Sequence, residues 1–189
     1  MTQDEILKLK AATLYVLQKS GGELDFIHLF KILYFAEREH YANYGKHLID
    51  DTFCALEHGP VPSFLYDAVK VATGIKQCTA DSPLRLIASA LLPGGGECRY
   101  YVIRASEAPD RDELSKAAIA SLDKSIAENL PKDVKQLSDD SHDEAWTEAW
   151  NERHASPMKS LSIAKAGGAS EGFLDYIKEQ ETLDRLLAD

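Results

Sequence analysis

The chain has 189 residues, 44% hydrophobic and 28% charged, which is typical of a single soluble globular domain with its own core. Its formal charge of −10 opposes binding to a phosphate backbone, so we expect nucleic acid not to be the main ligand. Residues 105–152 carry 13 acids and 5 bases, and this concentrated negative charge favours a basic protein partner.

The sequence has no run of 18 apolar residues, and its first residues lack a basic start followed by an apolar stretch. We therefore expect neither a transmembrane helix nor a secretory signal. Cys54, Cys78 and Cys98 are an odd number without close spacing, which argues against a disulfide framework. These features together favour a cytoplasmic protein.

Two helices are predicted first, over residues 4–19 and 26–44, the second with Asp25 as its N-cap and Gly45 at its end. The first half of the second helix is apolar on nearly every face, so we place it at the centre of the fold. Lys31 is the only charge in that apolar run. We expect the stem of Lys31 to lie along the core with the ammonium reaching solvent. The alternative is that the ammonium pairs with a carboxylate, on this chain or on a partner.

The middle of the chain mixes strands and a helix. Residues 52–57 are a strand candidate, whereas residues 58–62 are expected to be irregular because two prolines fix φ and remove two donors. A helix is predicted over residues 63–71. Strands over residues 85–92 and 99–104 are predicted to form a hairpin around the glycine-rich segment between them.

The remainder is predicted to be helical, with Ser141 and Glu144 forming a capping box at the start of one helix. The predicted fold class is α+β, predominantly α-helical, with about six helices and a small antiparallel sheet in one domain over residues 1–189. The later helices are expected over residues 110–129, 131–137, 141–150 and 170–187.

Enzyme motifs such as GxSxG, the P-loop, GxGxxG and HExxH do not occur in the sequence, so we expect no catalytic residue, cofactor or metal. His142, Asp143 and Glu144 are adjacent, but the two acids are better explained by a helix first turn than by a ligand set. Cys54 precedes His58 closely, and we predict a buried small side chain rather than a thiolate nucleophile.

Aromatic side chains leave two interpretations open. Trp146 and Trp150 are four residues apart and share a helix face, which suits either inward packing or an interface. The same choice applies to Tyr34, Tyr41 and Tyr44, together with His40.

Two other functions are compatible with parts of the sequence. The first two helices around a glycine break resemble a helix-turn-helix scaffold and allow a winged-helix-like transcriptional regulator, but the second helix offers apolar side chains where a recognition helix offers polar ones. A metal-dependent hydrolase would have to use His58, His142, Asp143 and Glu144.

Three ordered segments stand out in the sequence. They are LFKILYFA at residues 29–36 followed by His40 and by Tyr44 and Gly45, EHGPVP at residues 57–62 followed by Tyr66, and LSDDSHDEAW at residues 137–146. Together they resemble the Panacea domain, the SocA-like antitoxin domain also found in phage-associated GepA-type proteins. The resemblance covers about residues 10–150. The chain departs from the family pattern at His58, where the family often has Tyr or Lys, and at residues 78–105, which look like an inserted hairpin.

The resemblance implies an antitoxin of a bacterial or phage toxin–antitoxin system. Such a protein neutralises a cognate protein toxin by direct binding and in some cases passes it, as an adaptor, to a Clp-type protease. The family is not known for a reaction, in agreement with the missing enzyme motifs. We expect seven residues to contact the partner or to shape its site: Tyr34, His40, Tyr41, His58, Tyr66, Trp146 and Trp150.

Overall fold

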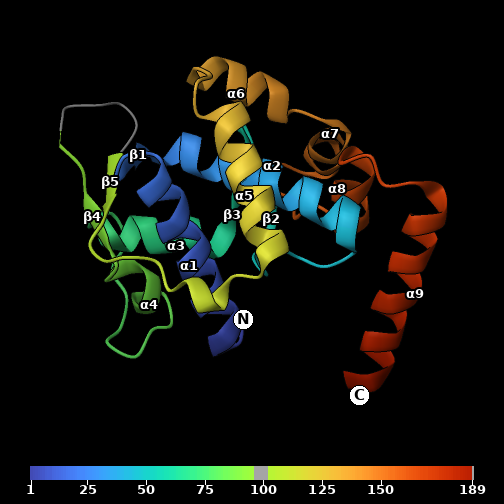
Figure 1. Cartoon of the computed structure of the whole chain (residues 1–189), viewed down its shortest axis with the longest axis horizontal. Coiled ribbons are helices and arrows are strands. Elements are labelled where there is room, and N and C mark those ends of the chain that lie inside the picture. The colour runs from blue at the N-terminus through green and yellow to red at the C-terminus, as the bar shows by residue number, and fades with distance from the viewer. Residues whose placement is uncertain (96–101, 189) are drawn as a thin grey trace.

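A computed structural model describes residues 1–95 and 102–188 (Figure 1). Helices dominate and two small antiparallel sheets accompany them, which confirms the predicted fold class. The helices of the described residues are α1 (Gln3–Lys19), α2 (Phe26–Tyr44), α3 (Ser63–Ala72), α4 (Arg85–Ala88), α5 (Lys116–Asn129), α6 (Val134–Ser141), α7 (Glu144–Glu152), α8 (Ser160–Ala166) and α9 (Glu171–Ala188). The strands are β1 (Glu23–Asp25), β2 (Phe53–Leu56), β3 (Gly59–Pro62), β4 (Leu91–Pro93) and β5 (Val102–Ala105).

Helix α2 lies at the centre, as predicted, and contacts α1, α5, α6, α8 and β3. Its ends are set locally. The Asp25 carboxylate accepts the N–H of His28 at 3.0 Å, and Gly45 ends the helix in the left-handed region with φ +62°. In Figure 1, α5 crosses in front of α2, and α9 extends away from the body of the protein.

The first sheet has the strand order β1-β5-β4, with Leu24 opposite Ile103. The predicted strand over residues 85–92 is wrong in its first half, which forms the short helix α4. The neighbouring residues Ile87 and Ala88 are both buried, which an alternating strand would not allow. Part of the predicted hairpin turn, residues 96–97, and the start of its second strand, residues 99–101, lie outside the described residues.

The expectation that residues 58–62 are irregular is also wrong, because Gly59–Pro62 forms β3, antiparallel to β2. The two prolines lie opposite Phe53 and Ala55, whose own backbone groups bond to residues 155–158 on the other edge of β2. Residues of β3 opposite Phe53 and Ala55 therefore donate no backbone N–H to β2, so proline, which has no N–H, is tolerated there.

Helix α3 is capped from a distance. Pro62 stands at its N-cap without a side-chain bond, and the Asp51 carboxylate accepts instead from the N–H groups of Phe64 and Leu65 at 3.0 and 2.9 Å. The Ser63 hydroxyl adds a third bond at 3.3 Å. This carboxylate joins the loop before β2 to the start of α3.

The predicted capping box at Ser141 and Glu144 is wrong. Ser141 ends α6, and Asp143 caps α7 by accepting the N–H of Trp146 at 3.1 Å. The helix predicted from residue 110 begins later, after a 3-10 turn, and α8 was not predicted. Among the residues that the structure describes, no helix combines the length and apolar character needed to cross a bilayer.

Gly59 provides a test of how closely β3 packs. Its φ is +96°, and a Cβ here would meet Ser141 Oγ and come within 2.9 Å of Lys31 Nζ. Gly22 is a matched control, since its φ is +94° and nothing lies within 4 Å of the corresponding position. We expect Gly22→Ala to lower the free energy of unfolding by about 1–3 kcal/mol from backbone strain alone.

Gly59→Ala should cost at least about 1 kcal/mol more than Gly22→Ala, because overpacking adds to the same strain. Urea unfolding of the two variants measures the difference. Equal losses of stability would contradict the close contact between Gly59, Lys31 and Ser141.

Candidate functional site

Four aromatic rings stack along α7 and the residues that flank it. His142 stacks on Trp146 with ring centroids 3.8 Å apart, Trp146 stacks on Trp150 at 5.2 Å, and His154 meets Trp150 edge-on at 4.2 Å. The four-residue spacing of Trp146 and Trp150 puts the two tryptophans on one face of α7, and His142 and His154 flank them outside the helix. His154 is exposed and both tryptophans are half-buried, so this aromatic column is partly accessible at the surface.

The start of α7 is fixed to two other elements. One Asp143 oxygen caps the helix, and the other accepts the Tyr34 hydroxyl at 2.7 Å and Arg38 Nη1 at 2.8 Å, both from α2. The Trp146 indole N–H donates to the carbonyl of Leu56 in β2 at 2.9 Å. These bonds hold the aromatic column against α2 and β2 before any partner arrives.

Lys31 lies beneath the column and is only 1% exposed, so the expectation that its ammonium reaches solvent is wrong. Lys31 Nζ donates to the carbonyl of Pro60 at 2.8 Å instead of meeting a carboxylate. Burial lowers the pKa of Lys31 to about 7. Burial also lowers the pKa of His142, and the nearby charge of Lys31 lowers it further.

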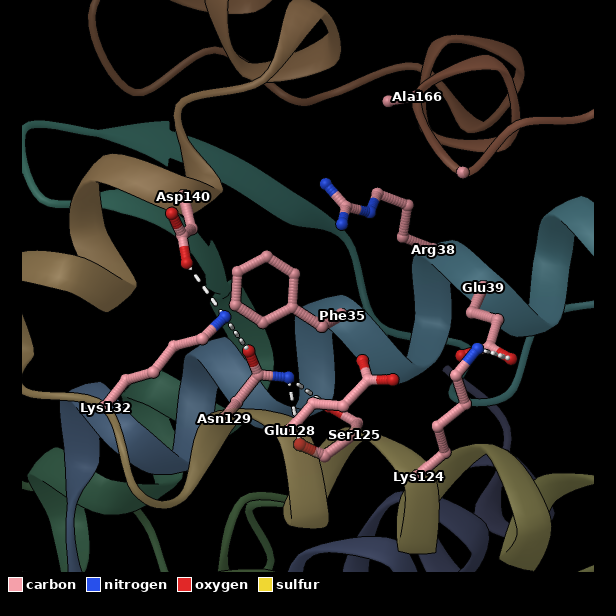
Figure 2. Close-up of a pocket in the computed structure, with 11 residues that line it drawn as sticks. Phe35, Arg38, Glu39, Lys124, Ser125, Glu128, Asn129, Lys132, Asp140 and Ala166 are labelled. Atoms are coloured by element: carbon pink, nitrogen blue, oxygen red, sulfur yellow. Dashed lines mark hydrogen bonds and ion pairs between the residues drawn. The ribbon is translucent and has the colours of Figure 1, made fainter.

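A polar pocket of about 400 Å³ opens between α2, α5, α6 and α8 (Figure 2). Phe35 lies in it, with the Arg38 guanidinium 4.9 Å and Lys132 Nζ 5.6 Å from its ring centre. Each cation around it already has an acidic partner within the chain: Arg38 with Asp143, Lys124 with Glu39, and Lys132 with Asp140. The pocket is therefore poorly suited to a phosphate group.

The residues predicted to contact or shape a partner site fall into two groups. Tyr34, His40 and Tyr41 are buried, so they can only shape a surface. His40 Nδ1 lies 3.2 Å from Ser121 Oγ, and burial lowers its pKa. Tyr34 bonds directly to Asp143, the residue that caps α7.

The other four reach the surface in different places. Trp146 and Trp150 share the column, and His58 is exposed at the turn between β2 and β3. Tyr66 lies on α3, where its ring packs against Phe30 with centroids 5.8 Å apart. The structure thus brings the two tryptophans together with Tyr34 but places Tyr66 elsewhere.

Sequence reasoning missed Arg38 and His154. A signal for His154 was present, since it follows Trp150 at the same spacing that separates the two tryptophans. Nothing local pointed to Arg38, because its partner Asp143 lies more than a hundred residues away in the sequence.

Two of the side chains considered for a metal-dependent hydrolase already have partners or positions in the fold. The Asp143 carboxylate caps α7, and Glu144 is exposed near Lys165. Over residues 1–95 and 102–188, no cluster of three or more metal-ligating side chains occurs. Burial raises the pKa of Cys54, which is the reverse of what a thiolate nucleophile requires.

The buried Lys31 should give stability a distinctive pH dependence. The unfolded chain keeps this proton up to about pH 10.5, whereas the folded chain loses it near pH 7. Between these values the unfolded state binds more protons, so the contribution of Lys31 to stability rises with pH. Relative to Lys31→Met, the wild type should gain up to about 1.4 kcal/mol per pH unit above pH 7.

Urea unfolding at several pH values measures this difference, and other titrating groups cancel between the two proteins. A difference that stays constant above pH 7 would show that Lys31 keeps its proton in the fold.

Residues 29–147 match the family model described as antitoxin SocA-like, Panacea domain. No curated protein and no solved structure matches the chain. The matched segment spans more than half of the sequence and includes α2 from Leu29 onward, the β2–β3 hairpin, α6 and the start of α7. These are the elements that hold the aromatic column, and the chain belongs to the SocA-like antitoxin family, as a Panacea domain.

Proposed function

We propose that this protein is an antitoxin that neutralises a cognate protein toxin in the cytoplasm by direct binding, with the aromatic column as the contact surface. Family membership supports the antitoxin role. The observation that carries the choice of surface is the pair of half-buried tryptophans, Trp146 and Trp150, stacked between His142 and His154. Tryptophan is enriched among the residues that contribute most to binding energy at interfaces.

The rigidity of the column supports the same proposal. Asp143 and Trp146 already bond to α2 and β2, so their conformations are fixed in the free protein. The column then loses less conformational entropy when a partner binds than a mobile surface would. The exposed His58, at the neighbouring hairpin turn, extends the surface beyond α7.

The charge of the chain favours a basic toxin. With a net charge of −10, the protein attracts cations over a distance of about one Debye length. We expect the association rate constant to fall about tenfold or more between about 0.05 M and 0.5 M salt, with little change in the dissociation rate. Stopped-flow mixing measures both rates, and a salt-independent association rate would contradict electrostatic attraction.

The family resemblance extends the proposal to an adaptor role, in which the bound toxin passes to a Clp-type protease. In that case the protease should degrade the toxin faster when this protein is present. Toxin that is stabilised by the complex would limit the role to binding.

The contact surface is tested by Trp150→Ala, with Tyr176→Ala as a matched control. Tyr176 is a 49% exposed aromatic on α9, away from the column. Against the product of the neighbouring reading frame, we expect Trp150→Ala to weaken binding about thirtyfold or more, and Tyr176→Ala to have little effect. Calorimetric titration measures the affinities, and thermal unfolding verifies that both variants fold.

The outcomes distinguish the antitoxin function from the choice of the aromatic column as its contact surface. If the wild type binds and Trp150→Ala binds equally well, the column is not the contact surface. If the wild type neither binds that product nor relieves its toxicity, the antitoxin proposal is wrong.

A further inference from the structure

A second pocket, on another side of α2, contains a serine, a histidine and a glutamate in hydrogen-bonding order. Glu37 is on α2, His47 is in the loop that follows it, and Ser160 begins α8. His47 Nδ1 lies 2.5 Å from Glu37 Oε1, and His47 Nε2 lies 3.3 Å from Ser160 Oγ. A base held between a hydroxyl and a carboxylate is the arrangement that activates nucleophilic serines.

The histidine ring is held in one orientation. Glu37 is 1% exposed, and its second oxygen accepts the N–H groups of Leu48 and Ile49 at 2.9 Å each, so the carboxylate cannot rotate freely. The ring of Tyr41 stacks on His47 with centroids 4.3 Å apart and planes 12° apart. When Nδ1 donates its proton to Glu37, Nε2 presents its lone pair to the Ser160 hydroxyl.

A small molecule can reach these groups. All three side chains line a pocket of about 290 Å³, and Phe53, Met158 and Ile163 form the apolar part of its wall. The acids nearby already have partners, because Asp50 pairs with Lys8 at 3.0 Å and Asp51 caps α3. Ser160 and His47 are thus the polar pair best placed to meet a ligand, and a small acyl group suits the volume.

We propose that Ser160 is a nucleophile, activated by His47 and Glu37, that accepts an acyl group from a small ester. Ser160 Oγ attacks the ester carbonyl carbon, and its proton passes to His47 Nε2. The bond to the alcohol oxygen breaks, and His47 returns the proton to the departing alcohol. Water, deprotonated by His47, then attacks the acyl carbonyl carbon; the bond to Ser160 Oγ breaks and His47 returns the proton to Ser160 Oγ, so that one ester and one water give one acid and one alcohol.

This activity uses no residue of the aromatic column and goes beyond toxin binding. It also predicts a pH dependence. Burial is the largest influence on His47 and lowers its pKa, but the hydrogen bond to Glu37 and the negative charges of Glu37 and Asp50 together outweigh burial and the nearby charge of Lys8, so the pKa lies above the ordinary value of 6.5. The reaction should be slow when His47 is protonated and should accelerate as the pH rises through this pKa.

The test uses the full-length protein with a fluorophosphonate probe and with p-nitrophenyl acetate. We expect a covalent probe adduct on Ser160, located by peptide mass spectrometry, and ester hydrolysis that Ser160→Ala abolishes. His47→Ala should slow the labelling about 100-fold or more. Ser162→Ala is the control, since this hydroxyl is on the same helix but donates to Glu148 and should not affect labelling.

Three results would overturn the proposal: no adduct on Ser160 in the folded protein, equal hydrolysis by Ser160→Ala and the wild type, or a labelling rate that does not change between about pH 5 and 9. Since the assay contains no toxin, its failure leaves the antitoxin proposal unaffected.

Discussion

The structure depends on one constraint: the polar side chains of a helix buried on almost every side must each find a partner. Burying such groups without a hydrogen bond costs about 1–3 kcal/mol each. Several of those on α2 bond to other parts of the chain, so the helix fixes the positions of segments far apart in sequence. Lys31 holds β3, Tyr34 and Arg38 hold the start of α7, Glu37 holds the loop before β2, and His40 contacts α5.

The same bonds build the two proposed functional surfaces. The Asp143 carboxylate connects α2 to the aromatic column, so the column is presented in a fixed orientation. The Glu37 carboxylate connects α2 to His47 and so to Ser160 in the second pocket. A buried residue whose hydrogen bonds are made within the chain can therefore determine the geometry of a surface. That surface is one at which a partner or substrate would bind.

Local features of the sequence predicted much of the fold. Asp25 and Gly45 set the two ends of α2, and each acts within one turn of the helix. The apolar run between them places the helix in the core. Features that depend on distant partners were not predictable. Strand β3 tolerates its prolines because the register places them opposite Phe53 and Ala55, whose backbone groups bond on the other edge of β2. Lys31 is buried where Pro60, 29 residues further along the chain, offers a carbonyl to it.

The candidate site, too, was predictable where it depends on local spacing and not where it depends on distant partners. The shared face of Trp146 and Trp150 follows from helical spacing. Asp143, not Ser141, caps α7, and its second oxygen bonds to Tyr34 and Arg38, which lie more than a hundred residues earlier and leave no local signal.

Amide hydrogen exchange on Asp143→Ser tests most directly whether α2 positions the column. Serine is a good N-cap but cannot replace the carboxylate that Tyr34 and Arg38 share. The account predicts at least about tenfold faster exchange over α7, while the protection of α1 and α2 stays unchanged. Unchanged protection of α7 would contradict it.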